Sequence, residues 1–156
     1  MKLYLDTSII SAYFDFLKPV RQLITVKWIS HDAKNFDLFI SNLVILEISA
    51  TKDQELREKM ISLIAKIKPQ VLEMNETIED LAKQYREKII PKEINDSLHI
   101  ATAVSHKMDA IVSWNFKHIV NLRTISEIHK INMMNKLTLL EILSPENLGG
   151  EIYGDV

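Results

Sequence analysis

Short apolar runs alternate with longer amphipathic segments along the chain. The short runs predict β-strands over residues 2–5, 37–40, 70–73, 110–113 and 137–142. Between them, apolar residues recur at three- and four-residue spacing, which predicts helices over 19–35, 41–50, 53–68, 75–89, 94–107 and 116–132. A further short helix is expected directly after the first strand. This alternation predicts a doubly wound α/β domain built on a parallel sheet.

Polar residues and proline mark the element boundaries. Ser41 and Asn42 are interpreted as the cap of the helix that follows, and Pro69 as the end of the helix before it. Phe116 to Asn132 is predicted to be mostly helical, in one or two pieces. Residues 144–156 have turn-like composition and are interpreted as a C-terminal tail, so residues 1–143 are predicted to form a single domain.

The composition narrows the functional classes. In 156 residues, 47% are hydrophobic and 26% are charged, which excludes global disorder, and the lack of cysteine excludes disulfides and thiolate metal sites. No apolar run approaches the length of a membrane span, and the N-terminus lacks signal-peptide features, so we expect a cytoplasmic protein. The net charge of −2 gives no bulk attraction to nucleic acid, and RNA binding would require a local basic patch or metal ions.

Four polar side chains interrupt apolar surroundings where a site is expected. Asp6 directly follows the first predicted strand, and Asn115 follows the fourth. Glu47 and Asp96 lie in helices that are otherwise strongly apolar. Each has an ordinary structural interpretation as a helix cap, a solvated side chain, a partner of the helix dipole or a turn residue. In open parallel sheets, however, ligands bind beyond the carboxyl ends of the strands, where these residues are expected.

Several carboxylates near a core would repel one another and lose hydration. A divalent cation resolves both problems, and hard oxygen ligands favour Mg²⁺ or Mn²⁺. Such an ion can lower the pKa of a water molecule and bind a phosphodiester during hydrolysis. The pattern therefore indicates metal-dependent cleavage of a nucleic acid.

Four segments, in this order, resemble the PIN-domain nucleases, especially the VapC-like toxins of type II toxin–antitoxin systems. They are LYLDTSII (3–10), SNLVILEI (41–48), NDSLHIATA (95–103) and DAIVSWNFKHI (109–119). The resemblance implies a three-layer α/β/α domain with a five-stranded parallel sheet flanked by helices. It also implies a Mg²⁺- or Mn²⁺-dependent endoribonuclease that hydrolyses RNA through a metal-activated water.

The resemblance assigns the catalytic and metal-binding acids residue by residue. Asp6, Glu47 and Asp96 match the first three acidic positions, and Asn115 falls on the fourth, which is usually Asp in the family. An amide oxygen can ligate a metal but adds no negative charge. We therefore predict one firmly held metal ion, with a second recruited mainly by the substrate phosphate. The alternative is a catalytically weakened PIN module that binds RNA or protein as a scaffold.

Neighbouring residues have predicted supporting roles. Thr7 or Ser8 would support the first carboxylate through a hydroxyl group. His99, one helical turn after Asp96, is expected to be hydrogen-bonded beneath the site rather than to touch substrate. Lys117 and His118 are candidate ligands of RNA phosphates, with a solvated helix start as the alternative interpretation.

The resemblance also implies partners: an RNA substrate, a cognate antitoxin, and a second copy of the chain in a homodimer. A phosphotransfer receiver domain is disfavoured because the chain lacks the central acceptor Asp and the late Lys. A nucleotide-binding domain is disfavoured because the chain has no glycine-rich phosphate loop.

Overall fold

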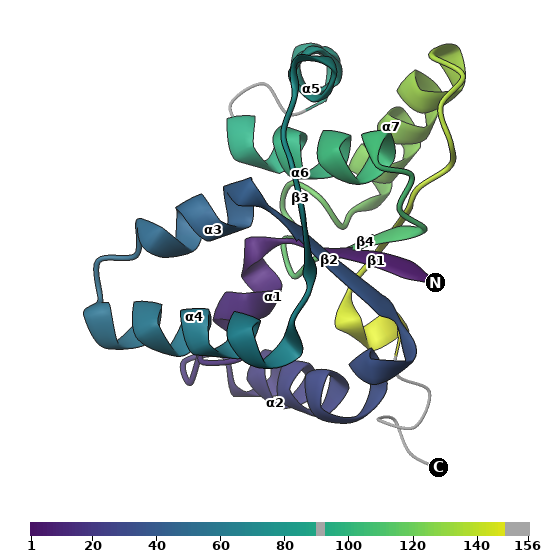
Figure 1. The fold of residues 1–156 in the computed structure, drawn as a ribbon. Coiled ribbons are helices and arrows are strands. Elements are labelled where there is room, and N and C mark those ends of the chain that lie inside the picture. Colours follow the sequence, from purple (N-terminus) through teal and green to yellow (C-terminus); the bar gives the residue numbers. More distant parts are fainter. Residues whose placement is uncertain (90–92, 149–156) are drawn as a thin grey trace, which may run out of the picture.

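A parallel sheet with the strand order β3-β2-β1-β4-β5 forms the centre of the molecule (Figure 1). The strands are β1 (Lys2–Leu5), β2 (Asp37–Ser41), β3 (Gln70–Leu72), β4 (Ala110–Val112) and β5 (Glu141–Leu143). All four pairings are parallel. The computed structural model describes residues 1–89 and 93–148. It confirms the predicted five-stranded parallel sheet.

Helices cover both faces of this sheet. They are α1 (Thr7–Ala12), α2 (Pro19–Lys27), α3 (Asn42–Ser49), α4 (Gln54–Ile67), α5 (Glu76–Lys88), α6 (Ile94–Ser105) and α7 (Leu122–Met134). Helices α5, α6 and α7 lie together on one face, and α1, α2 and α4 lie on the other (Figure 1). Helix α3 follows β2 and packs against α1 and α4. The predicted three-layer α/β/α arrangement is therefore confirmed.

The core lies where the central strands are covered on both faces. Leu3 and Leu5 of β1 and Ile111 and Val112 of β4 have no exposed surface. Strands buried on both sides favour continuous apolar runs over alternating ones, which is why β4 could be recognised in the sequence.

The strand order places a change of direction between β1 and β4. From β1 the chain builds outward through β2 and β3, and then returns to the other side of β1 with β4. Leu5 lies opposite Val112 in the register of these two strands. The residues that follow, Asp6 and Ser113, consequently lie next to each other at the carboxyl edge of the sheet, where open α/β sheets bind ligands.

The end of β2 differs from the prediction in its capping. Ser41 does precede α3, but its side chain makes no capping hydrogen bond to the helix backbone. Its hydroxyl group instead lies 2.7 Å from the hydroxyl group of Tyr4 in the core. Ser41 therefore occupies the predicted cap position, but its side chain does not cap the helix because its hydroxyl group contacts a buried polar partner in β1.

The predicted helix over 19–35 is helical in three different geometries. Helix α2 ends at Lys27 and is followed by a π-helical turn, Trp28–Asp32, and a 3₁₀ turn, Ala33–Asn35. Trp28 and Ala33 are both buried, and the backbone N–H of Ala33 donates to the carbonyl of Trp28. This five-residue separation is that of a π turn, which an α-helical pattern does not anticipate.

The prediction was least accurate near the C-terminus. Residues 116–121 are not helical, and α7 begins only after Asn121, whose side chain accepts the backbone N–H of Thr124. The fifth strand covers only Glu141–Leu143, against the predicted range 137–142, and Leu137 and Leu139 before it are exposed. A 3₁₀ turn (Pro145–Asn147) opens the predicted tail, and residues 149–156 of that tail lie outside the described range. No helix in the described segments is long and apolar enough to span a bilayer.

Candidate functional site

Asp6 is a carboxylate held at the carboxyl end of β1. It is the N-cap of α1, and its side chain is only 4% exposed. Its Oδ1 accepts the backbone N–H of Ser8 (3.0 Å) and the Ser8 hydroxyl (2.5 Å), while its Oδ2 accepts the Ser113 hydroxyl (2.5 Å). Burial raises the pKa of Asp6, although the His99 charge and these three donors oppose that rise. Both oxygens are consequently fixed in direction.

Two serines join this carboxylate to the end of β4. The Ser8 hydroxyl accepts the backbone N–H of Trp114 (2.8 Å), and the Ser113 hydroxyl accepts the backbone N–H of Asn115 (2.9 Å). Each serine therefore connects Asp6 to the backbone that follows β4. The sequence indicated a hydroxyl partner at Thr7 or Ser8, and the structure places Ser8 there. Ser113 was missed because it had been interpreted as the last residue of the strand.

His99 connects the second candidate acid to the core. Its Nε2 lies 2.5 Å from Glu47 Oε1, and its Nδ1 lies 2.6 Å from the Tyr4 hydroxyl. The imidazole is 2% exposed, so it is buried and contacts a partner on each side. Thr7 donates its hydroxyl to the same Glu47 oxygen at 3.0 Å and not to Asp6.

The surroundings of Glu47 act on its pKa in opposite directions. Partial burial raises the pKa, but the hydrogen bond and charge of His99, with hydrogen bonds from Thr7 and Asn95, outweigh it. The pKa of Glu47 is therefore lowered, and the carboxylate stays ionised.

The third candidate acid, Asp96, lies in the first turn of α6. The Asn115 amide nitrogen donates to Asp96 Oδ2 at 3.1 Å, while the Asn115 amide oxygen accepts the backbone N–H of His118 at 2.9 Å. The amide thus presents a donor to the carboxylate, and its oxygen stabilises the turn after β4. Burial raises the pKa of Asp96; the His99 charge lowers it and the charge of Asp6 raises it further.

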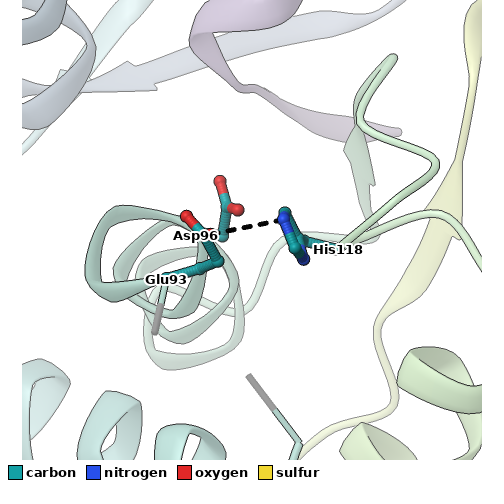
Figure 2. A group of neighbouring side chains, drawn as sticks. All are labelled: Glu93, Asp96 and His118. Atoms are coloured by element: carbon teal, nitrogen blue, oxygen red, sulfur yellow. Dashed lines mark ion pairs between the residues drawn. The ribbon is translucent and has the colours of Figure 1, made fainter. Parts of the chain in front are cut away.

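A compact group of possible metal ligands surrounds Asp96. One ligand atom each from Glu93, Asp96 and His118 lie within 4.8 Å of one another, and no other such group of three or more occurs in the described residues. Figure 2 shows these side chains converging from the start of α6 and from the turn after β4. His118 Nε2 lies 3.3 Å from Glu93 Oε1.

This group changes the interpretation of His118. The sequence indicated a phosphate ligand, but the imidazole faces two carboxylates. Glu93 was missed, although its three-residue spacing from Asp96 at the start of a helix could have indicated a shared face. Lys117, the other predicted phosphate ligand, lines a pocket that also reaches Ser8 and Asn115.

One known protein family matches a range of residues that contains most of the site. The family model described as "PIN domain" matches residues 3–118, a range that contains Asp6, Glu47, Asp96 and Asn115. The chain belongs to the PIN-domain family. The match confirms the family proposed from the four sequence segments.

Solved structures support the same fold. One is VapBC2 from Rickettsia felis, whose structure was solved bound to a DNA fragment from its promoter. It is 16% identical to this chain with a TM-score of 0.55, and the match covers 92% of this chain and 98% of that one. VapC20 from Mycobacterium tuberculosis, a toxin that cleaves the sarcin–ricin loop, is 14% identical with a TM-score of 0.56, over 74% of this chain and 92% of that one. The search of curated proteins found no significant match.

Proposed function

We propose that this PIN domain is a divalent-metal-dependent endoribonuclease of the VapC-like toxin type. The observation that carries the proposal is the placement of Asp6 and Asp96. Burial raises the pKa of both groups, and the charge of Asp6 raises that of Asp96 further. Within the described residues, neither carboxylate forms an ion pair with Lys or Arg. A divalent cation would offset this charge.

The chemistry of the donors suits such an ion, and among the described residues the compact group of ligand atoms is that of Glu93, Asp96 and His118. Asp6, Glu47 and Asp96 supply hard oxygen ligands, and Glu93 and His118 extend the set beside Asp96. When bound, the ion would neutralise a phosphodiester and acidify a water molecule. This chemistry is also what we expect of a PIN domain that acts as a toxin.

The residues around the acids would act by positioning. Ser8 and Ser113 direct the two oxygens of Asp6, and His99 directs Glu47. The Asn115 amide directs Asp96. No side chain of this group needs to act as a nucleophile. Each acid instead keeps a fixed orientation toward an ion and a phosphate, which limits the reorganisation needed during cleavage.

An antitoxin would be the partner of such a toxin. The VapBC2 structure from Rickettsia felis is a relative by fold, and its name pairs two components. In this chain, large apolar side chains of α2 and the turn before it are exposed, namely Phe16, Leu17, Val20 and Leu23. We propose that an antitoxin segment covers this surface. A homodimer and a cytoplasmic location are further parts of the proposal.

One assay tests the catalytic proposal. Purified protein is incubated with total RNA and Mn²⁺ or Mg²⁺, beside an Asp6→Asn variant and an EDTA control. We expect cleavage by the wild-type protein alone, with a loss of about 100-fold or more in the variant. Equal cleavage by both proteins would indicate a contaminant. Cleavage by neither protein would favour a PIN module that acts only as a scaffold.

A further inference from the structure

A pocket of about 550 Å³ opens beside the carboxylate centre. Ser8 and Asn115, which hydrogen-bond to Asp6 and Asp96 respectively, form part of its lining. Lys18, Arg21 and Lys117 line the same pocket. It lies between α1, the start of α2 and the turn after β4. The acidic centre therefore has a cationic neighbour in a chain whose net charge is −2.

Arg21 is the best positioned of these cations. Its guanidinium carbon lies 5.4 Å from the ring centroid of Trp114 and 5.0 Å from that of Phe116. The two rings are themselves in edge-to-face contact, with centroids 5.9 Å apart. The indole N–H of Trp114 donates to Thr25, one turn after Arg21 on α2 (2.8 Å). Helix α2 thus contacts Trp114 at two points, which holds the guanidinium group against the pocket wall.

Within the part of the chain that the structure describes, the positive charge of the pocket is not offset by ion pairs. No carboxylate of the described residues lies within ion-pair distance of Lys18, Arg21 or Lys117. Asp15 is the carboxylate in the pocket lining, and its Oδ1 accepts the backbone N–H of Leu17 in a turn. Aromatic rings hold a guanidinium without neutralising it, so the N–H donors of Arg21 stay available to an anion.

We propose that this pocket binds the RNA strand next to the cleaved phosphodiester, with Arg21 as the main phosphate ligand and Lys18 and Lys117 beside it. The inference rests on the proposed function, because it assumes that RNA is cut at the neighbouring carboxylates. A strand placed there must continue onto adjoining surface, and a cationic pocket attracts its phosphates. Phe116, 39% exposed, adds an aromatic surface for a base. An acidic peptide would use the cations but not this ring.

Binding can be measured without cleavage. Fluorescence anisotropy of a labelled oligouridylate in EDTA, at several KCl concentrations, gives both affinity and its dependence on salt. Arg21→Ala should weaken binding about tenfold and reduce the slope of log K against log salt by about 0.7. The Lys18→Ala, Lys117→Ala double variant should reduce the slope by about 1.4. Arg21→Lys should restore the slope but only part of the affinity.

Matched controls separate a local effect from a general one. Arg123→Ala removes an exposed cation on α7, away from the pocket lining, and should change neither affinity nor slope. Lys18 and Lys117 are also exposed, so their substitution tests the pocket even if Arg21→Ala destabilises the fold. Unchanged slopes in the double variant and in Arg21→Ala would overturn the inference. Labelled polyglutamate serves as the probe for the acidic-peptide alternative. Pocket variants that lose binding to polyglutamate but keep their binding to RNA would also overturn the inference.

Cleavage kinetics distinguish this inference from the proposed function. If the wild-type protein cleaves RNA with Mn²⁺, the pocket variants should raise KM more than they lower kcat. Cleavage with a wild-type KM in these variants would overturn the pocket assignment and leave the nuclease proposal intact. If the wild-type protein does not cleave RNA, the nuclease proposal fails. The salt slopes then decide whether the pocket binds RNA.

Discussion

The Asn115 side chain donates its amide N–H to Asp96 and accepts the backbone N–H of His118. It therefore holds a carboxylate from one helix against the turn after β4. An Asp at this position would retain the acceptor but lose the donor, and would place a second negative charge beside Asp96. The amide consequently stabilises the metal-free form of this site.

This relationship gives the first prediction. Asn115→Asp should lower the free energy of unfolding of the metal-free protein, by about 1 kcal/mol, because a hydrogen bond is replaced by repulsion. The same change should tighten Mn²⁺ binding, because it adds a charged ligand. Urea unfolding in EDTA and calorimetric Mn²⁺ titration measure the two effects. Unchanged stoichiometry and affinity for Mn²⁺ would contradict the prediction.

The raised pKa of Asp6 predicts how stability depends on pH. The folded protein holds the proton of the Asp6 carboxyl group more tightly than the unfolded chain does. The contribution of Asp6 to stability is therefore greatest below its ordinary pKa of 3.8. It is lost as the pH rises through the raised pKa of the folded state. Asp6→Asn removes this loss. In EDTA, the variant should gain stability relative to the wild-type protein as the pH rises.

Urea unfolding of both proteins at a series of pH values from about 4 to about 8 measures this difference. Glu47 contributes with the opposite sign, because its pKa is lowered from 4.5. Its contribution is present above that value and is lost as the pH falls, equally in both proteins. A difference between wild type and Asp6→Asn that does not change with pH would show that the buried carboxylate carries no penalty.

Metal binding should offset the destabilisation that the buried Asp6 carboxylate causes. At a Mn²⁺ concentration of about 100 times Kd, the free energy of unfolding should rise by about 2.7 kcal/mol. Asp6→Asn should lose most of this gain, because it removes a charged ligand. Thermal melting with and without Mn²⁺ measures both proteins. An equal shift in the two would place the ion elsewhere.

The contact between His99 and Glu47 predicts a positioning effect. His99→Gln should lower Mn²⁺ affinity and RNA cleavage by about 10- to 100-fold, since the orientation of Glu47 would be lost. Tyr4→Phe is the matched control, because it removes the bonds of the Tyr4 hydroxyl to His99 and Ser41 but leaves the contact between His99 and Glu47 in place. It should reduce both quantities less. If the two variants lose metal affinity equally, the imidazole acts through core packing rather than through Glu47.

The ligand set around Asp96 predicts a metal preference. An imidazole favours Mn²⁺ and Zn²⁺ over Mg²⁺, whereas carboxylates alone discriminate less. His118→Ala should therefore weaken Mn²⁺ binding more than Mg²⁺ binding, as measured by competition calorimetry. Lys117→Ala, a neighbouring change that lies outside this group, should leave the ratio unchanged. A ratio that is unaffected by His118→Ala would remove the imidazole from the metal site.

Much of this fold could be predicted because its central strands are buried on both faces. β1 and β4 appear in the sequence as uninterrupted apolar runs that end in polar residues, which also locates Asp6 and Asn115. The π turn after α2 could not be predicted, since Trp28 fits the helical spacing of the residues before it, and the bond from Ala33 to Trp28 exists only in the folded chain. Leu137 and Leu139 are apolar yet exposed, so periodicity alone extended the last strand too far.

The site was predictable at its acids but not at their partners. Asp6, Glu47 and Asp96 stand out as charges in apolar segments, and their metal-binding roles stay predictions. The contacts of Ser113 and Tyr4 depend on strands that meet only in the folded sheet. Arg21 has an ordinary place on an amphipathic helix, and nothing in its local sequence indicates that it lies over Trp114.

The Ser113 hydroxyl reaches Asp6 across a separation of 107 residues. During synthesis, the first carboxylate leaves the ribosome almost at once, but the strand that completes its surroundings emerges only after two-thirds of the chain has been made. Until then Asp6 lacks one of its donors, and Asp96 lacks the amide of Asn115. A nascent chain that ends before β4 therefore lacks part of the surroundings of both carboxylates, which are complete only when β4 has joined the sheet.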